Sequence, residues 1–311
     1  MIMSEVNSTI LRQAFNKVSM EGYVKKMELE SKVNDKGKTS IRGSITIMTA
    51  PGEDHNIDVF VPQLTKKDEI NKAYVGIQTV MNEFVSMGSL MQSGKTQQEA
   101  MNECTKVRMT SGQLSRNEYA GQNGQLVSRP SISCNYFSSL KDDEFHPGTR
   151  FEVEGYIEKI QDEMKDGDDT GRKLVTLIVP VYGGKVYPMN FVVGADLGAA
   201  FEDAYEVGQT AHFNGEIIDV AVVSTSNRGG FGRANEERTF VHEWRILGGD
   251  PAYDENDSRS FSPEAIRAAM TVRETETIPA ILARKSNAAP AAPAAPAAPV
   301  VTADEASKFR I

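Results

Sequence analysis

The segment from Ser226 to Arg238 is rich in glycine and arginine and contains one phenylalanine. Glycine lets a backbone approach a phosphate chain closely, arginine supplies positive charge, and an aromatic ring offers a face on which a base can stack. Long hairpin loops also collect glycine for conformational reasons alone, so a structural role stays open. The segment's candidate nucleic-acid contacts are Arg228, Phe231, Arg233 and Arg238.

A second loop, residues 116 to 124, has a similar composition, and we expect Arg116 and Tyr119 to play comparable roles there. Further basic side chains lie in or near turns that follow the first strand of each half of the chain. Lysines in turns are usually only solvated, so these residues are predicted as supporting contacts. They are Lys36, Lys38, Arg42, Arg172 and Lys173.

Three aromatic residues fall on strand faces opposite their apolar neighbours. Tyr23 and Tyr156 each follow a glycine, and Phe60 alternates with inward-facing valines. Exposed aromatic rings on a sheet can stack bases, each contributing about 1 to 3 kcal/mol. The alternative is that the tyrosines pack under a linker or against the other half. Trp244, the only tryptophan, shares a face with apolar neighbours and is expected in the core.

The elements that must position these residues are clearest between residues 149 and 248. Three runs with strand character are followed by a helical stretch over residues 195 to 205 and then by two more strands. The order strand, strand, strand, helix, strand, strand is that of an OB barrel, which binds oligonucleotides with its sheet face and two loops.

The same pattern occurs earlier in the chain, between residues 18 and 140. The residues around Gly22 match those around Gly155, and those around Gly112 match those around Gly215. The helix of this copy is predicted over residues 68 to 87. Its apolar stripe comprises Ile70, Tyr74, Ile77, Val80, Met81, Phe84 and Val85. An internal repeat of this kind predicts two OB barrels in tandem and a mainly β protein.

The remaining segments flank or join the two predicted barrels. A short docking helix is expected within residues 1 to 17, and a linker over residues 141 to 148. The first barrel is assigned to residues 18 to 140 and the second to 149 to 249. Residues 250 to 285 form a polar segment with a helix capped by Ser262, and residues 286 to 311 form a disordered tail rich in alanine and proline.

Composition limits the possible functions of the 311 residues. The net charge of −9 argues against a basic face for duplex DNA. Apolar runs are too short for a membrane span and no signal peptide is recognisable, so a cytoplasmic protein is expected. The two cysteines, Cys104 and Cys134, are expected to be buried free thiols.

Catalytic and cofactor motifs find little support, so we expect a protein that is not an enzyme and needs no cofactor. Residues 93 to 96, Ser-Gly-Lys-Thr, are similar to the end of a phosphate-binding loop, but the required preceding glycine is replaced by Ser89. The four histidines lie far apart without the spacing of a metal site, and no metal is expected.

With strand order, loops and tail in place, the chain resembles the single-stranded DNA-binding proteins that bacteriophages encode for replication. The resemblance covers residues 18 to 249 as a fold pattern and 286 to 311 as a tail layout. It implies tandem OB barrels, binding of single strands without sequence preference, and a C-terminal tip that contacts replication proteins. In bacterial relatives the tip ends in consecutive aspartates before Ile-Pro-Phe, whereas here Phe309 and Ile311 stand near a mixed-charge end and are the candidate partner contacts.

The sequence thus predicts a sequence-independent single-stranded DNA-binding protein, of phage origin, acting in replication or recombination. An adaptor protein of a phage particle or replisome that binds protein through the same loops is the alternative, favoured by the negative net charge. Binding of RNA and assembly into a homo-oligomer both stay open.

Overall fold

The computed structural model describes residues 11–226 and 235–286, and it is mainly β. Eleven strands form one continuous sheet in the order β10-β11-β9-β8-β7-β1-β2-β3-β5-β4-β6. The strands of the first half are β1 (Asn16–Val33), β2 (Thr39–Ala50), β3 (Glu53–Pro62), β4 (Lys106–Ala120), β5 (Leu126–Ser133) and β6 (Phe137–Ser139). Those of the second are β7 (Gly148–Lys165), β8 (Asp168–Pro180), β9 (Val186–Val193), β10 (Thr210–Ser226) and β11 (Asn235–Gly249).

Each half of the sheet closes on itself. In the first half the order β1-β2-β3-β5-β4 is closed by pairing of β4 with β1, and in the second the order β7-β8-β9-β11-β10 is closed by pairing of β10 with β7. The helix α4 (Ala195–Ala204) lies between β9 and β10 in the chain, so the second half has the predicted element order. Closure turns apolar side chains inward, and the rings of Phe151, Phe191 and Phe213 are fully buried.

The ladders of the two halves are built alike. Val18 lies opposite Gly112, and Phe151 lies opposite Gly215. Both first strands also shift register at the same place, after Val24 and after Ile157. A shift re-aims the strand that carries it, so β1 and β7 bend at equivalent positions.

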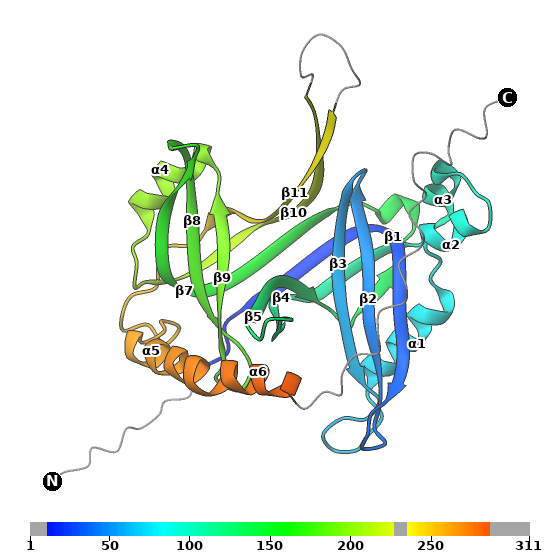
Figure 1. Ribbon diagram of the computed structural model, residues 1–311, viewed down its shortest axis with the longest axis horizontal. Coiled ribbons are helices and arrows are strands. Elements are labelled where there is room, and N and C mark those ends of the chain that lie inside the picture. The colour runs from blue at the N-terminus through cyan, green and yellow to red at the C-terminus, as the bar shows by residue number, and fades with distance from the viewer. Residues whose placement is uncertain (1–10, 227–234, 287–311) are drawn as a thin grey trace, which may run out of the picture.

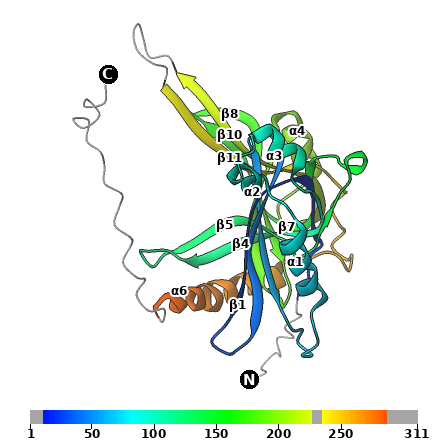
Figure 2. The ribbon, with the colours of Figure 1, turned by 90° about the vertical axis from the view of Figure 1, so that its right-hand side faces the viewer.

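The two halves are joined through their first strands. Residues 16 to 21 of β1 pair antiparallel with residues 148 to 153 of β7, and Val220 of β10 pairs with Glu53 of β3. The halves therefore lie side by side, with the joined strands crossing between them (Figure 1). Figure 2 shows that the β4–β5 hairpin, the β10–β11 hairpin and the last helix extend toward the same side of the molecule.

The prediction of one helix over residues 68 to 87 was wrong. The chain instead forms α1 (Lys72–Glu83), α2 (Met87–Gln92) and α3 (Gln97–Glu103). Asn71 caps α1 and Ser86 caps α2, each accepting a hydrogen bond from a backbone N–H of the following turn. Because α1 starts later and ends earlier than predicted, Ile70 and Val85 lie outside it and are exposed, and the buried residues of the stripe, Tyr74, Ile77 and Val80, lie within α1.

The prediction of an N-terminal helix was also wrong in its described part. Residues 11 to 15 have no regular structure and β1 already begins at Asn16. The segment is held extended against the second half, where Ala14 N donates to Pro180 O at 2.9 Å. Arg12 makes two hydrogen bonds with Glu154, of 2.6 and 2.7 Å, whose side chain is only 5% exposed. These long-range bonds outweigh the local helical pattern; residues 1 to 10 lie outside the described ranges.

A long C-terminal helix follows the second half. It consists of α5 (Pro263–Val272), the π-helical turn η2 (Arg273–Thr277) and α6 (Ile278–Ser286). Its start is as predicted, since Ser262 caps it and Pro263 occupies the first turn. In the predicted linker the chain makes one turn of 3-10 helix, η1 (Asp142–Glu144).

Both cysteines are buried free thiols, as expected. Burial raises the pKa of the Cys104 thiol to about 11, so that it stays protonated at neutral pH. In the part of the chain that the structure describes, no helix combines the length and apolar character that crossing a membrane would require.

Candidate nucleic-acid interface

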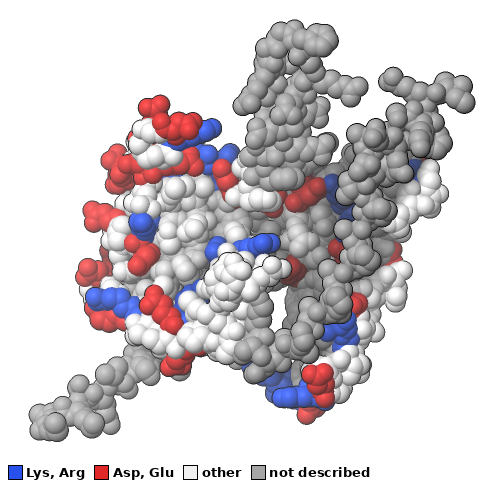
Figure 3. Space-filling model, in the orientation of Figure 1, with Lys and Arg blue, Asp and Glu red and all other residues white. Residues whose placement is uncertain are grey.

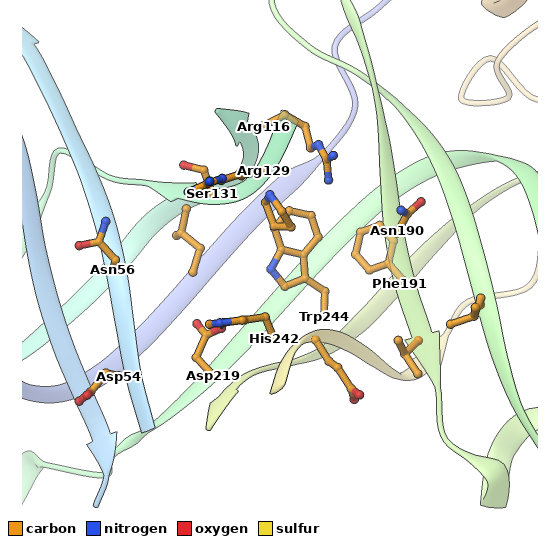
Figure 4. Close-up of a pocket in the computed structure, with 15 residues that line it drawn as sticks. Asp54, Asn56, Arg116, Arg129, Ser131, Asn190, Phe191, Asp219, His242 and Trp244 are labelled. Carbon is orange, nitrogen blue, oxygen red and sulfur yellow. The ribbon is translucent and has the colours of Figure 1, made fainter. Parts of the chain in front are cut away.

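A trough of about 680 Å³ lies where the two halves meet. Its walls come from β3, β4 and β5 of the first half and from β8, β9, β10 and β11 of the second. Figure 4 shows Asn56 and Asp54 entering from the β3 side and Asn190 and Phe191 from the β9 side, with Trp244 between them. Among the predicted contacts whose side chains the structure describes, Arg116 is the one that lines the trough.

Trp244 forms the apolar floor of the trough. It is 7% exposed and packs against Phe191 with ring centroids 5.5 Å apart. The expectation that this tryptophan belongs to the core is confirmed, although its edge also borders the trough. A rigid apolar floor suits an unstacked base, because every base has an apolar face.

Each acidic residue that lines the trough is engaged by a basic or histidine side chain. Asp54 pairs with Lys25, and Glu243 pairs with Arg172 at 2.6 Å and with Arg245 at 3.2 Å. Asp219 lies between two histidines, whose Nδ1 atoms are 2.8 Å (His55) and 2.7 Å (His242) from its oxygens. All three carboxylates are thus held in place by side chains of the protein.

The two arginines of the trough differ from these acids. In the described part of the chain neither Arg116 nor Arg129 forms an ion pair with a carboxylate. Arg116 donates to the side chain of Ser128 at 3.0 Å and to its backbone oxygen at 3.1 Å. Arg129 is exposed, with its guanidinium 6.0 Å from the centre of the Tyr119 ring. Two positive charges therefore face the trough without forming an ion pair with a carboxylate of the described chain.

Matching amide side chains stand on opposite walls. Asn56 lies across from Thr46 in the first half, and Asn190 lies across from Thr176 in the second. Both asparagines are exposed, and Thr176 Oγ1 is 3.1 Å from Asn190 Oδ1. Amides can both donate and accept hydrogen bonds, so each can meet a base or a sugar without demanding one sequence.

Phe60 and Arg42 lie beside the trough on the first half. Phe60 is 64% exposed and is on the same face of β3 as Asn56, four residues further along the strand. Arg42 is its direct partner on β2. The structure thus brings a predicted stacking ring and a predicted cation together, on a surface that continues the β3 wall.

The two predicted tyrosines are packed rather than open. Tyr23 makes an edge contact with Phe145 of the linker, with ring centroids 4.9 Å apart. Tyr156 is half-buried against the core of the second half, and burial raises the pKa of its hydroxyl. Tyr23 thus packs under the linker, as the alternative interpretation predicted, whereas Tyr156 packs against its own half, which neither interpretation had named.

Arg172 and Lys173 are engaged with carboxylates. Arg172 bonds Glu243 and lies 3.4 Å from Glu163, while the buried Lys173 contacts Asp162 at 2.5 Å and Glu202 at 2.7 Å. These two predicted phosphate contacts are therefore already neutralised. Lys36 and Lys38 are exposed in the turn between β1 and β2, away from the residues that line the trough.

Several predicted residues fall outside the described side chains. Arg228, Phe231 and Arg233 lie in the stretch from 227 to 234, and Phe309 and Ile311 lie beyond residue 286. For Arg238 the structure gives only its backbone pairing with Val223. The predicted roles of these six residues stay predictions.

Arg129 and the two asparagines were not among the residues predicted from the sequence. Asn56 alternates with the buried Ile57 just as Phe60 does, so the same reasoning could have found it. Arg129 precedes Pro130 in a run without clear alternation, so the sequence did not indicate its direction. Its position at the trough becomes clear only in the fold, where it lies near Tyr119. Figure 3, in the orientation of Figure 1, shows basic side chains near the middle of the molecule, whereas acidic ones gather over α4.

We expect Asp219→Asn to lower the free energy of unfolding, and to lower it most at neutral pH. Burial alone would raise the pKa of Asp219, but hydrogen bonds from His55 and His242 outweigh it and hold the pKa below the ordinary 3.8. A lowered pKa stabilises the fold above that ordinary value, and this contribution is lost as pH falls through the folded pKa. The asparagine side chain has one oxygen in place of two and cannot accept hydrogen bonds from both histidines in this geometry. The free energy of unfolding should therefore fall by about 2 kcal/mol.

Urea denaturation of both proteins near neutral pH and at about pH 3 measures this effect. The difference in unfolding free energy should shrink at the lower pH, because the wild-type carboxylate is then becoming protonated. A difference that grows on acidification would show that Asp219 is not the charged centre of the cluster.

A model of the family described as YorF matches residues 14–279. Among solved structures, the wild-type single-stranded DNA binding protein from Thermus aquaticus aligns with a TM-score of 0.47 and 8% identity, over 79% of this chain and 97% of the other. A deletion mutant of the same protein aligns with a TM-score of 0.44 and 10% identity, over 81% and 98%. A search of curated protein sequences found no match.

Proposed function

The chain belongs to the YorF family, and for this member we propose that the trough binds single-stranded DNA without reading its sequence. Charge pairing at the trough is the observation that carries the proposal. Asp54, Asp219 and Glu243 have basic partners, whereas Arg116 and Arg129 have no carboxylate partner among the described residues. An acidic protein thereby presents local positive charge at one place, as phosphate binding requires.

We propose that each half is an OB-type barrel. The closed strand orders, the helical connection between third and fourth strands, and the trough between sheet faces and hairpins support this assignment. A strand of DNA would contact the arginines through its phosphates, while Phe60, Tyr119 and the trough floor would receive bases. Bases would not be recognised individually, because the amides on both walls accept either hydrogen-bonding pattern.

We further propose a binding protein and not an enzyme, since the acids and histidines of the trough are engaged in structural pairs. A role in replication or recombination, phage origin and recruitment of replication proteins through Phe309 and Ile311 are supported by the sequence layout alone. We include this role, this origin and this recruitment in the proposal because the sequence layout supports them.

Fluorescence anisotropy with labelled oligo-dT tests the proposal. We expect tight binding at low salt, with log affinity falling by about 0.7 per phosphate contact for each unit of log salt concentration. Oligo-dA should bind comparably, and a DNA duplex much more weakly. Preference for oligo-U over oligo-dT would assign RNA instead, and absence of binding to any of these would favour the adaptor alternative.

A further inference from the structure

The C-terminal helix spans from the second half to the β4–β5 hairpin of the first. Ile266 of α5 is buried in the core, and the Arg273 guanidinium lies 5.4 Å from the centre of the Tyr187 ring on β9. The same guanidinium reaches Glu118 on β4. The helix runs below β9 and β5 in Figure 1 and on the side of the β4–β5 hairpin in Figure 2. It therefore touches both halves close to the proposed site.

Arg273 and Glu118 form a buried ion pair. Their side chains are 7% and 4% exposed, and two hydrogen bonds join them, one of them 3.0 Å long. A buried charge without its partner is strongly unfavourable, so each residue needs the other. Arg273 also begins the π-helical turn η2, an irregularity that is often found at functional positions.

Glu118 connects this pair to the trough. Ser128 Oγ donates to Glu118 Oε1 at 2.7 Å, and the same hydroxyl oxygen accepts from Arg116 Nε at 3.0 Å. Arg116 Nη2 also donates to the Ser128 carbonyl oxygen at 3.1 Å. An unbroken series of hydrogen bonds thus runs from the helix to the trough arginine.

We propose that Arg273 is a positioning residue for the trough and that the C-terminal helix is part of the binding apparatus. By engaging Glu118, Arg273 keeps that carboxylate from pairing with Arg116, which then stays bonded to Ser128 and turned to the trough. The inference rests on the proposed function, because it concerns how the trough holds a phosphate. It adds a segment outside both closed halves to the residues that determine affinity.

Arg273→Met tests the proposal in the full-length protein. Methionine fills similar space but leaves Glu118 with Arg116 as the cation within reach, so Arg116 should be drawn out of the trough. We expect affinity for labelled oligo-dT to fall about tenfold, and the salt slope to lose about 0.7, the share of one phosphate. Arg267→Met is the matched control, because Arg267 forms an exposed ion pair with Glu264 on the same helix, and it should bind as the wild type does.

Removing the carboxylate as well distinguishes positioning from simple support. In Glu118→Leu with Arg273→Met no acid competes for Arg116, so affinity and salt slope should return to within about twofold of wild type. A double variant as weak as the single, or a single variant that binds like wild type, would overturn the proposal.

Folding of each variant is checked by thermal melting. If Arg273→Met does not fold, Ser128→Ala takes its place. It removes the hydroxyl that bonds both Arg116 and Glu118, leaves the bond from Arg116 to the backbone carbonyl, and does not open the ion pair. It should weaken binding in the same direction. Unchanged binding by Ser128→Ala would then overturn the positioning role. Failure of the wild type itself to bind oligo-dT would instead reject the proposed function on which this inference rests.

Discussion

Replacement of both Arg116 and Arg129 by alanine is expected to weaken binding of oligo-dT about 100-fold. A hydrogen bond to a charged group is worth about 1.5 to 3 kcal/mol, and each 1.4 kcal/mol is a factor of ten in affinity. Neither arginine forms an ion pair with a carboxylate in the described part of the chain, so each can offer its charge to a phosphate. Arg116 is partly buried, which strengthens its attraction for an anion.

The same variant should also bind with a shallower salt dependence. Loss of two phosphate contacts lowers the slope of log affinity against log salt by about 1.4 for a single strand. Anisotropy titrations at several salt concentrations measure both quantities. Alanine at Lys95 and Arg267 is the control, because it removes two exposed cations that lie outside the trough and pair with Glu103 and Glu264. An unchanged slope in the trough variant would place the phosphates elsewhere.

Local patterns in the sequence were enough to locate most strands and the direction of many side chains. The matched residues around Gly22 and Gly155 lie at the equivalent bends of β1 and β7. Alternation correctly placed Phe60 outward, and the apolar neighbours of Trp244 correctly placed it in the core. These are properties of a few consecutive residues, and periodicity reports them directly.

Partners distant in the sequence could not be predicted in this way. Arg172 looked like a free cation because Glu243, which neutralises it, is 71 residues away. Tyr23 was predicted to stack bases because the residues of its own strand do not indicate that Phe145 packs against it. Identifying the free arginines of the trough therefore requires knowing every ion pair around it, which only the folded chain supplies.

Some local signals were present but outweighed or overlooked. The N-terminal segment has helical spacing, yet the bonds of Arg12 and Ala14 to the second half hold it extended. The start of α3 carried a readable signal, because Thr96 and Glu99 have the spacing of a capping box and form one. Helix ends are better indicated by such caps than by the apolar stripe.

Gly112 and Gly215 look equivalent in sequence, but alanine at these two positions should have very different effects. A methyl group at Gly215 would lie 2.0 Å from the Arg245 backbone oxygen and 2.5 Å from Cζ of Phe151. Backbone and a fully buried ring cannot move aside cheaply, so Gly215→Ala should destabilise the protein by about 3 kcal/mol.

At Gly112 the residue across the ladder is Val18, and the nearest atom to an added methyl group is the flexible end of Met109, at 2.8 Å. A methionine side chain can change rotamer, so Gly112→Ala should cost about 1 kcal/mol or less. Urea denaturation of the two variants measures the contrast. The difference arises because a methyl group at Gly215 meets the Arg245 backbone oxygen and the Phe151 ring, whereas one at Gly112 meets the movable end of Met109 and the smaller Val18. Equal stability losses would contradict the packing of Phe151 against the closure of β7 with β10.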